Sequence, residues 1–191
     1  MVYKITDTNN VSSLFDKWDE TLIWSCLQGM MGKIYADDLY APTAAMAMIG
    51  DFAFFAGKPG IELVSYKPAW CTRNFMIMVP QNKFWENAIL DYYGERATVI
   101  SRYAIKKEPD VFDKEKLEKA VASLTKLYTL SMIDERLYQM CRAEAWSADL
   151  VSQFPDYDNY RKFGIGTVIC KEDVIISGAS SYSRYREGIE I

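Results

Sequence analysis

The sequence predicts an α+β protein with mainly antiparallel strands. Short β-branched and apolar runs bounded by Gly, Pro or charged turns alternate with segments whose apolar residues recur at helical spacing. The end of the chain, from Phe163 to Ile191, contains a strand, a turn, a longer strand, a second turn and the opening of a third strand. A strand, two helices and three consecutive antiparallel strands do not form a doubly wound parallel order.

Composition limits the function classes. The 191 residues are 50% hydrophobic and 14% aromatic, which suffices for one large or two small globular domains. The net charge is -4 and the basic residues are interspersed with acids, which argues against nucleic-acid binding. The longest apolar run, Ala44–Ile49, is far shorter than the roughly 20 residues of a membrane span. Because the N-terminus also has no apolar signal core, we expect a cytoplasmic protein.

Cysteine and histidine usage removes several chemistries. The four cysteines contain no C-x-x-C pair, so we expect reduced, buried thiols. The absence of histidine excludes Ser-His-Asp and Cys-His sites and most zinc hydrolase sites, and no metal site is predicted. Any general base must therefore be Glu, Asp, Tyr, water or a lysine with a lowered pKa.

The first half is predicted from the N-terminus onward. Apolar spacing predicts a helix over Val11–Gln28, with Gly29 as its stop. A strand is predicted over Lys33–Asp37, and a longer apolar strand over Ala44–Ala56, kinked at Gly50.

The chain then turns at Gly57–Gly60 into a strand-like segment. Phe75–Val79 is a predicted buried strand, and a further strand is expected over Ala97–Ile105. Between them, Pro80–Asn82 lead into a helix that ends at Gly94, with one apolar face: Phe84, Trp85, Ala88 and Ile89.

The second half follows a charged linker, Lys106–Lys116. A short amphipathic helix at Leu117–Leu124 precedes a strand at Tyr128–Met132. A helix of about five turns is predicted over Asp134–Phe154, and another helical turn over Asp158–Phe163.

The terminal meander comprises Gly164–Cys170, Val174–Tyr185 and Gly188–Ile191. Ending there would leave an unpaired sheet edge, so we expect the native chain to continue. A missing segment, or a partner such as a second copy in a homo-oligomer, would cover that edge.

Several peptides resemble the GCN5-related N-acetyltransferase (GNAT) family, in its two-domain bacterial type related to zwittermicin-resistance acetyltransferases. The element order is similar, and the matching stretches run through nearly the whole chain: Ser25–Gly29 with Met31-Gly32, Gly50–Gly57, Arg102–Pro109, Ser152–Phe154, Ser177–Tyr182 and Gly188–Ile191. The resemblance implies an N-terminal α/β domain followed by the first half of a GNAT fold, a mixed, mainly antiparallel sheet flanked by helices. Expected boundaries are 1–108 for a domain that is itself weakly GNAT-like, 109–126 for a linker and short helix, and 127–191 for a truncated acetyltransferase domain.

The resemblance implies transfer of an acetyl group from acetyl-CoA to a small-molecule amine. In this family an R/Q-x-x-G-x-G/A loop follows the fourth strand and holds the pyrophosphate at a helix N-terminus. The chain has no copy of it, because Gly164–Gly166 enter a strand and Gly57–Gly60 precede a strand-like segment. We expect that loop beyond Ile191.

The strand resembling the fourth GNAT strand carries the candidate catalytic residues. Glu190 is the candidate base, and the resemblance implies that Ile189 and Ile191 contact acetyl-CoA. A solvent-facing glutamate between two core isoleucines would give the same pattern.

Five residues are candidates for substrate binding: Gln153, Phe154, Ser181, Tyr182 and Ser183. The alternatives are a helix end with a core anchor for the first two and ordinary strand alternation for the last three. For the whole chain, the alternative function is a non-catalytic ligand-binding or protein-interaction module on a GNAT-like scaffold.

Overall fold

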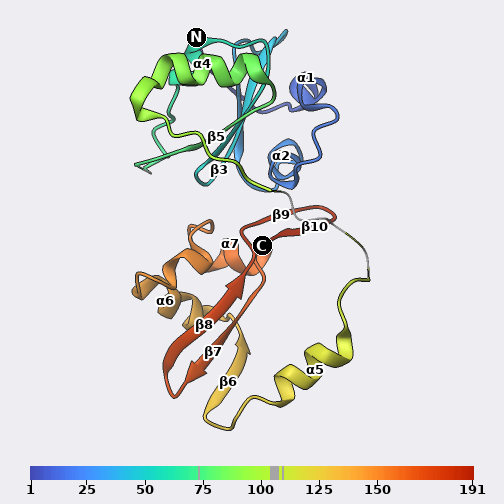
Figure 1. Cartoon of the computed structure of the whole chain (residues 1–191), viewed down its shortest axis with the longest axis vertical. Coiled ribbons are helices and arrows are strands. Elements are labelled where there is room, and N and C mark those ends of the chain that lie inside the picture. Colours follow the sequence, from blue (N-terminus) through green and yellow to red (C-terminus); the bar gives the residue numbers. More distant parts are fainter. Residues whose placement is uncertain (73, 104–107, 109) are drawn as a thin grey trace. The chain divides into compact units, whose positions relative to one another are not determined.

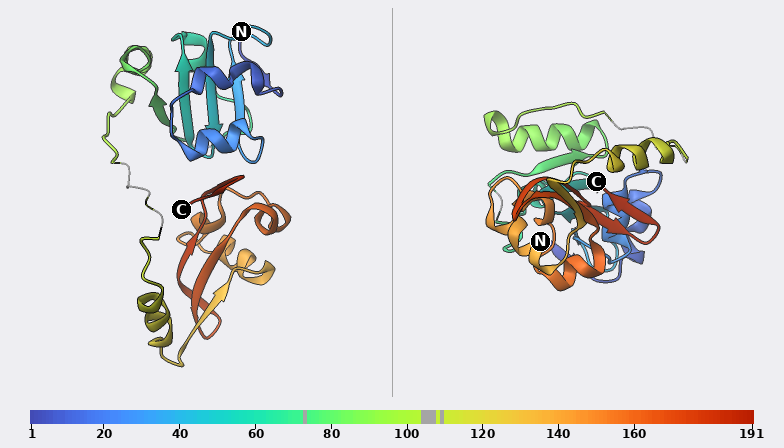
Figure 2. Two further views of the ribbon diagram at one scale, coloured as in Figure 1. Left: turned by 90° about the vertical axis from the view of Figure 1, so that its right-hand side faces the viewer. Right: turned by 90° about the horizontal axis from the view of Figure 1, so that it is seen from below.

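The computed structural model describes residues 1–72, 74–103, 108 and 110–191, which divide into two compact units. Unit 1 is Met1–Ala97 together with Ser181–Ile191, and unit 2 is Thr98–Ser180 (Figures 1 and 2). The expected α+β class with mainly antiparallel strands is confirmed. The domain boundaries drawn from the sequence stay a prediction, and the compact units differ from them by giving Ser181–Ile191 to unit 1.

Unit 1 is a five-stranded sheet with helices and a separate two-stranded hairpin. The strand order is β1-β2-β3-β4-β5, in which β4 and β5 run parallel and the other neighbours antiparallel. Its elements are β1 (Tyr3–Ile5), α1 (Asn9–Ser12), η1 (Ser13–Phe15), α2 (Thr21–Leu27), β2 (Lys33–Ala36), β3 (Ala44–Ile49), β4 (Phe52–Gly57), α3 (Ile61–Ser65), β5 (Ile77–Pro80), α4 (Lys83–Tyr93), η2 (Gly94–Arg96), β9 (Ser183–Tyr185) and β10 (Gly188–Glu190).

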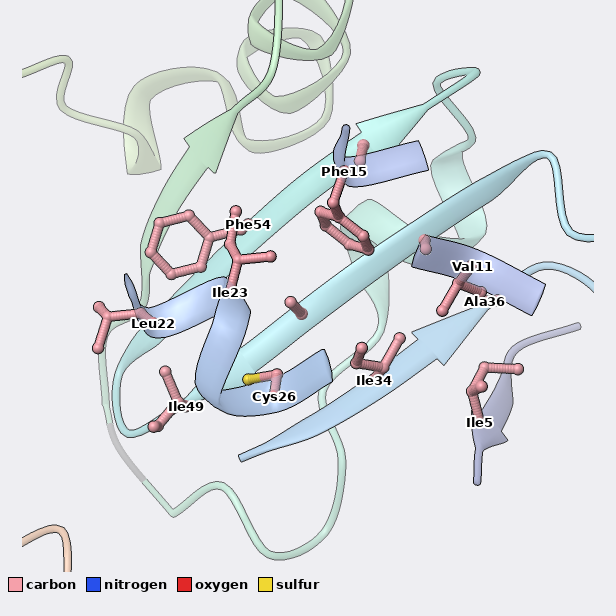
Figure 3. Close-up of a cluster of buried hydrophobic side chains, with 13 residues drawn as sticks. Ile5, Val11, Phe15, Leu22, Ile23, Cys26, Ile34, Ala36, Ile49 and Phe54 are labelled. Atoms are coloured by element: carbon pink, nitrogen blue, oxygen red, sulfur yellow. The ribbon is translucent and has the colours of Figure 1, made fainter. Parts of the chain in front are cut away.

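The sheet of unit 1 is covered on both faces. Along β3, Ala45, Ala47 and Ile49 face a cluster with Val11, Phe15, Ile23 and Cys26 from α1, η1 and α2 (Figure 3). The alternate residues Ala44, Met46 and Met48 face a second cluster with Leu63 and Val64 of α3 and Trp85 and Ile89 of α4. Because both faces of this sheet are buried, the sequence of β3 is a continuous apolar run.

Two long elements predicted in this unit are each divided in the structure. The helix predicted over Val11–Gln28 consists of α1, η1 and α2, because Lys17 has a positive φ of 64° and the Glu20 side chain accepts from the Leu22 amide, which starts α2 anew. The strand predicted over Ala44–Ala56 is the antiparallel pair β3 and β4, joined at Gly50, whose φ is 57°.

Three further expectations differ from the structure. The strand-like segment after Gly60 is the helix α3. Phe84 lies outside the apolar face of α4 and is 75% exposed, whereas Trp85 and Ile89 are buried as predicted. Of the strand expected over 97–105, residues 97–103 form neither helix nor strand, and residues 104 and 105 lie outside the described residues, as do 106, 107 and 109 of the expected linker.

Unit 2 is a three-stranded antiparallel sheet, in the order β6-β7-β8, with short helices. Tyr160 of α7 and Leu150 of η3 pack so close to Gly166 and Gly178 that a Cβ atom at either glycine would meet their side chains. The elements are α5 (Lys114–Ala122), β6 (Tyr128–Met132), α6 (Glu135–Ala143), η3 (Ala148–Val151), α7 (Tyr157–Phe163), β7 (Gly166–Lys171) and β8 (Val174–Ser180).

Two predicted elements of the second half are shorter in the structure. The helix predicted over Asp134–Phe154 ends at Ala143, where Glu144 becomes extended and the buried Ser147 hydroxyl donates to the Cys141 carbonyl. The strand predicted over Val174–Tyr185 ends at Ser180, and β9 pairs with β10 in a separate hairpin, so the predicted three-stranded terminal meander is wrong.

The expected state of the cysteines is confirmed, since all four are free and buried. Burial, partly offset by backbone hydrogen bonds, raises the pKa of the Cys26 thiol to about 12, which keeps it protonated at neutral pH. Across the part of the chain that the structure describes, no helix combines the length and apolar character needed to cross a bilayer.

Candidate functional site

The terminal hairpin of β9 and β10 packs on helix α2 along a polar contact, which we call the seam. The α2 side of the seam is Thr21, Trp24, Ser25 and Gln28, and the hairpin side is Tyr182–Glu190. Thr21, Trp24 and Ser25 lie within α2 and Gln28 is its C-cap. Their spacing of i, i+3, i+4 and i+7 places them along one face of the helix. A contact with residues more than 150 positions away thus runs along the length of α2.

Glu190 lies at one end of the seam. Its carboxylate accepts a hydrogen bond from the hydroxyl of Thr21, and Thr21 is only 2% exposed. The Glu190 carbonyl accepts from the Tyr182 amide at 2.7 Å, so both its side chain and its main chain are held. The residue is half-buried rather than solvent-facing, and a carboxylate with one protein donor retains acceptor capacity for another group.

The middle of the seam combines a buried hydroxyl and two aromatic rings. Ser25 donates to the Arg184 carbonyl at 2.5 Å and is fully buried. The rings of Trp24 and Tyr185 meet edge to face, with centroids 5.5 Å apart. These contacts fix the register of the hairpin along the helix.

The other end of the seam is polar and more exposed. The Gln28 amide group donates to the Glu187 carboxylate at 3.1 Å and its oxygen accepts from the Arg186 backbone amide at 2.7 Å. Before β9, the Tyr182 hydroxyl donates to Asp51 at 2.6 Å, and its ring packs edge to face on Phe52. The hairpin is therefore attached at both ends as well as in the middle.

Ser183 is the unusual residue of the seam. Its side chain is fully buried, and among the described residues its hydroxyl is the one buried side-chain polar atom without a hydrogen-bond partner. Ser183 pairs with Glu190 in the β9–β10 register, and paired residues project from the same face of a ribbon. A buried polar atom left unsatisfied costs about 1–3 kcal/mol, so this hydroxyl calls for a physical explanation.

The structure brings six predicted site residues together on one segment of unit 1: Ser181, Tyr182, Ser183, Ile189, Glu190 and Ile191. Ser181 is buried, Ile189 is half-buried opposite Arg184, and Ile191 is 83% exposed. The assignments of Ile189 and Ile191 to acetyl-CoA stay predictions.

The other two predicted residues belong to unit 2. Phe154 is 1% exposed, its ring packs edge to face on Tyr160, and its carbonyl accepts from the Tyr138 hydroxyl at 2.7 Å. Gln153 is half-buried, and its amide group donates to the Ser152 hydroxyl at 3.3 Å. The surroundings of Phe154 are those of a core anchor, while the substrate role of both residues stays a prediction.

Sequence reasoning missed the α2 side of the seam. Thr21 and Ser25 are hydroxyl residues four positions apart within an otherwise apolar helix, and both are buried. Buried hydroxyls on a core-facing helix need partners, which was the available signal. The identity of those partners was not available, because the hairpin is remote in sequence.

Binding of acetyl-CoA requires free backbone N–H groups that can donate to its pyrophosphate. The Gly57–Gly60 turn joins β4 to α3, but its Gly57 amide donates to Gln81 and its Lys58 amide to the Thr43 carbonyl. The α3 helix also carries Glu62 in its first turn, which disfavours an anion there. This turn does not fit a pyrophosphate, so its residues are not assigned to that group.

Two neighbouring aspartates, Asp37 and Asp38, stabilise a turn rather than form a binding site. Asp37 accepts from the Thr43 hydroxyl and from the amides of Thr43 and Ala44, while Asp38 accepts from two amides of its own turn, which is a common role of aspartate in turns.

Unit 1 also has a hollow of about 310 Å³. None of the predicted site residues lines it; the lining residues are Asp16, Lys17, Trp18, Val79, Pro80 and Gln81.

Comparison with known proteins gives a family match and a structural match. The model of the GNAT acetyltransferase family matches residues 12–191. A crystal structure of a GCN5-related N-acetyltransferase-like protein from Streptococcus suis is similar, with 39% sequence identity and a TM-score of 0.85. That similarity covers 96% of this chain and 73% of the Streptococcus suis chain. No curated protein matches this sequence.

Proposed function

Because the chain belongs to the GNAT acetyltransferase family, we propose that it takes part in moving an acetyl group from acetyl-CoA to a small-molecule amine. The observation that supports a site in this chain is the half-buried Glu190 carboxylate, oriented by the buried Thr21 hydroxyl. A carboxylate fixed in this way is suited to accept a proton from a reacting group.

The role of Glu190 follows from the proton balance of amide formation. The amine reacts in its neutral form, so a protonated amine first releases one proton to water. As the neutral nitrogen bonds to the acetyl carbon, the bond from that carbon to sulfur breaks, coenzyme A leaves as its thiolate, and the nitrogen loses a proton to Glu190, the proposed acceptor. Acetyl-CoA supplies the thioester as a substrate. The residues of this chain supply the base and its orientation.

We place this reaction in the cytoplasm, with a small-molecule amine as the acceptor, and we propose that the protein does not bind nucleic acid. The acidic composition supports the absence of nucleic-acid binding, since a phosphate backbone requires clustered basic residues. A homo-oligomer stays a prediction, and light scattering over a concentration series tests it.

The test of the reaction measures acetylated products by mass spectrometry, with acetyl-CoA and a panel of small primary amines. Glu190→Gln keeps the shape of the side chain but removes the base, and we expect turnover to fall by about 10²–10⁴-fold. Glu187→Gln is the matched control, because that carboxylate lies at the exposed end of the seam and should leave turnover unchanged. Unchanged turnover of Glu190→Gln across the pH range would remove Glu190 from the reaction.

The alternative is a non-catalytic ligand-binding or protein-interaction module. The observation that favours it is the Gly57–Gly60 turn, whose first two amides are already bonded within the protein. Calorimetry with acetyl-CoA, carried out on the native protein with any segment that follows Ile191, separates the two proposals. Micromolar binding supports the acetyltransferase, whereas an amine that binds in the absence of any acetyl-CoA affinity supports the module.

A further inference from the structure

We propose that the hollow of unit 1 is a binding site for a free α-amino acid with an apolar side chain. The hollow measures about 310 Å³, and two segments line it, Asp16–Trp18 and Val79–Gln81. Small-molecule sites span about 300–1,000 Å³, so this hollow suits a compact ligand. None of the residues proposed for acetyl transfer lines it, and the site is therefore additional to that function.

The place of the hollow in the sheet favours a ligand. Val79 and Pro80 are the last residues of β5, which pairs in parallel with β4. In sheets with parallel strands, ligands bind outside the carboxyl ends of the strands, where the chain leaves the sheet. The segment Asp16–Trp18, between η1 and α2, lies against this end of the parallel pair.

Gln81 fixes the two lining segments relative to each other. Its side-chain oxygen accepts from the Gly57 amide at 3.0 Å, and its amide group donates to the Leu14 carbonyl at 2.7 Å. Its backbone amide donates to the Phe55 carbonyl at 3.0 Å. One residue thus joins the end of β5 to β4 and to the segment that precedes Asp16, and a site with fixed walls spends less free energy on ordering when a ligand binds.

Lys17 is the unusual residue of the hollow. Its φ of 64° lies in the left-handed region that favours glycine. The turn around it is held by the Asp16 amide, which donates to the Ser13 carbonyl at 3.3 Å, and by the Trp18 amide, which donates to the Phe15 carbonyl at 3.2 Å. Strained backbone positions of this kind cluster at ligand sites, so a lysine at this position points to a role for its side chain.

The two charges of the hollow select the charged groups of the ligand. Asp16 and Lys17 are exposed, and among the described residues neither side chain has an ion pair or a hydrogen bond. An α-amino acid carries an ammonium and a carboxylate on one carbon, and it can therefore satisfy both side chains at once. A ligand with only one of these charges would leave the other side chain without a partner.

The rest of the lining selects the side chain of the ligand. Trp18, Val79 and Pro80 are half-buried, so they offer apolar surface beside the exposed charges. The Trp18 ring is held edge to face on Phe54, with centroids 5.9 Å apart. An aromatic or aliphatic side chain that covers this surface removes it from water.

The test measures binding of L-phenylalanine to the complete protein by calorimetry and by NMR, with no acetyl-CoA present. We expect a dissociation constant of about 1 mM or lower. Two probes each lack one charge: 3-phenylpropanoate has no ammonium, and 2-phenylethylamine has no carboxylate. Each should bind at least about tenfold more weakly than phenylalanine. Equal binding of either probe, or no binding of phenylalanine, would overturn the proposal.

Variants of Lys17 separate binding from folding. Lys17→Gln removes the charge and should lower phenylalanine affinity about tenfold, while Lys17→Arg should retain it. Lys17→Gly should also lose affinity, yet keep an equal or higher melting temperature, because glycine adopts this φ without strain. Lys4→Gln is the control, since Lys4 is exposed on β1 at the opposite edge of the sheet from β5. Unchanged affinity in Lys17→Gln would exclude Lys17 from the site.

Glu190→Gln distinguishes this site from the proposed reaction. Phenylalanine affinity should persist in that variant, because Glu190 does not line the hollow. A loss of affinity would place the amino acid at Glu190 and overturn the proposal. Absent acetyl transfer with intact phenylalanine binding would count against the proposed function alone.

Discussion

The two units share a run of similar elements, which in unit 2 follows helix α5, but they bury their sheets to different extents. In unit 1, β1, α1, α2 and the antiparallel strands β2, β3 and β4 occur in order, and in unit 2, β6, α6, α7, β7 and β8 follow a similar order. All six residues of β3 are buried, whereas buried and half-buried residues alternate along most of β7. A similar order of elements thus supports a sheet that is buried on two faces in unit 1 and on one face in unit 2.

The residues of the two faces in unit 2 make this difference concrete. Val168 and Cys170 of β7 are buried, on the face packed by η3 and α7. On the opposite face, Leu130 and Met132 of β6 are 40% and 57% exposed. A core formed by only one face of a sheet buries fewer side chains per strand. We therefore expect unit 2 to be less stable than unit 1.

The largest expected effect is on the doubly buried core of unit 1. Trp85→Ala removes a fully buried side chain that also donates from its indole nitrogen to the Gly57 carbonyl, and should destabilise unit 1 by about 3–5 kcal/mol. Phe84→Ala, at the adjacent and 75% exposed position, should change stability by no more than about 0.5 kcal/mol. Urea unfolding with hydrogen exchange on peptides of β3 and β4 measures both, and similar losses would contradict the assignment of the inner face.

The second-largest expected effect tests whether the core of unit 2 lies on only one face of its sheet. Leu137→Ala in α6 removes a side chain that is 3% exposed and should cost about 2–5 kcal/mol. Met132→Ala on the open face should cost less than about 1 kcal/mol, because most of that side chain already contacts water. Hydrogen exchange of β7 amides reports on this unit, and equal effects of the two variants would mean that its open face is also buried in solution.

A smaller effect is expected where the hairpin joins unit 1. Thr21→Val keeps the shape but removes the hydroxyl that donates to Glu190, at a cost of about 1–3 kcal/mol. The reporter is exchange of the Tyr182 amide, which donates to the Glu190 carbonyl. Thr21→Ser retains the hydroxyl and should retain most of the protection. Equal protection in the valine variant would show that the hydroxyl does not hold the hairpin.

Local signals predicted much of the fold, and the failures have identifiable causes. Lys33–Asp37 and Tyr128–Met132 correspond to β2 and β6 because their β-branched and apolar content is local. The Ala44–Ala56 run hid a hairpin, since a sheet covered on both faces erases the polar alternation that marks a turn. The division of Val11–Gln28 depends on the left-handed Lys17, a conformation that favours glycine and that its sequence does not signal.

The candidate site was predictable on one side only. The Ser181–Ser183 and Glu190 candidates lie together in the structure, because they belong to one short hairpin. Thr21 joins them through a contact that spans 169 positions, and no local pattern encodes a partner at that distance. The apolar spacing predicted a helix over Val11–Gln28, but such spacing does not show that a terminal segment as well as the sheet packs on this part of the helix.

The smallest effect concerns a turn of unit 1 and its dependence on pH. Partial burial alone would raise the pKa of the Asp37 carboxyl, but hydrogen bonds from the Thr43 hydroxyl and from the Ala44 and Thr43 amides outweigh it and hold the pKa below its ordinary value. The folded state therefore binds this proton less readily than the unfolded state. The resulting stability is present above the ordinary aspartate value of about 3.9 and is lost as pH falls through the lowered folded value.

Asp37→Asn should therefore be slightly less stable than the native chain at pH 7, and the difference should shrink under acid conditions. Melting temperatures between pH 7 and pH 2.5 measure this convergence. Asp110→Asn serves as the control, because this aspartate is exposed and its side chain accepts no hydrogen bond from the described residues, so the variant should give a parallel curve. A constant gap between native and Asp37→Asn curves would mean that the turn depends on the shape of the side chain rather than on its charge.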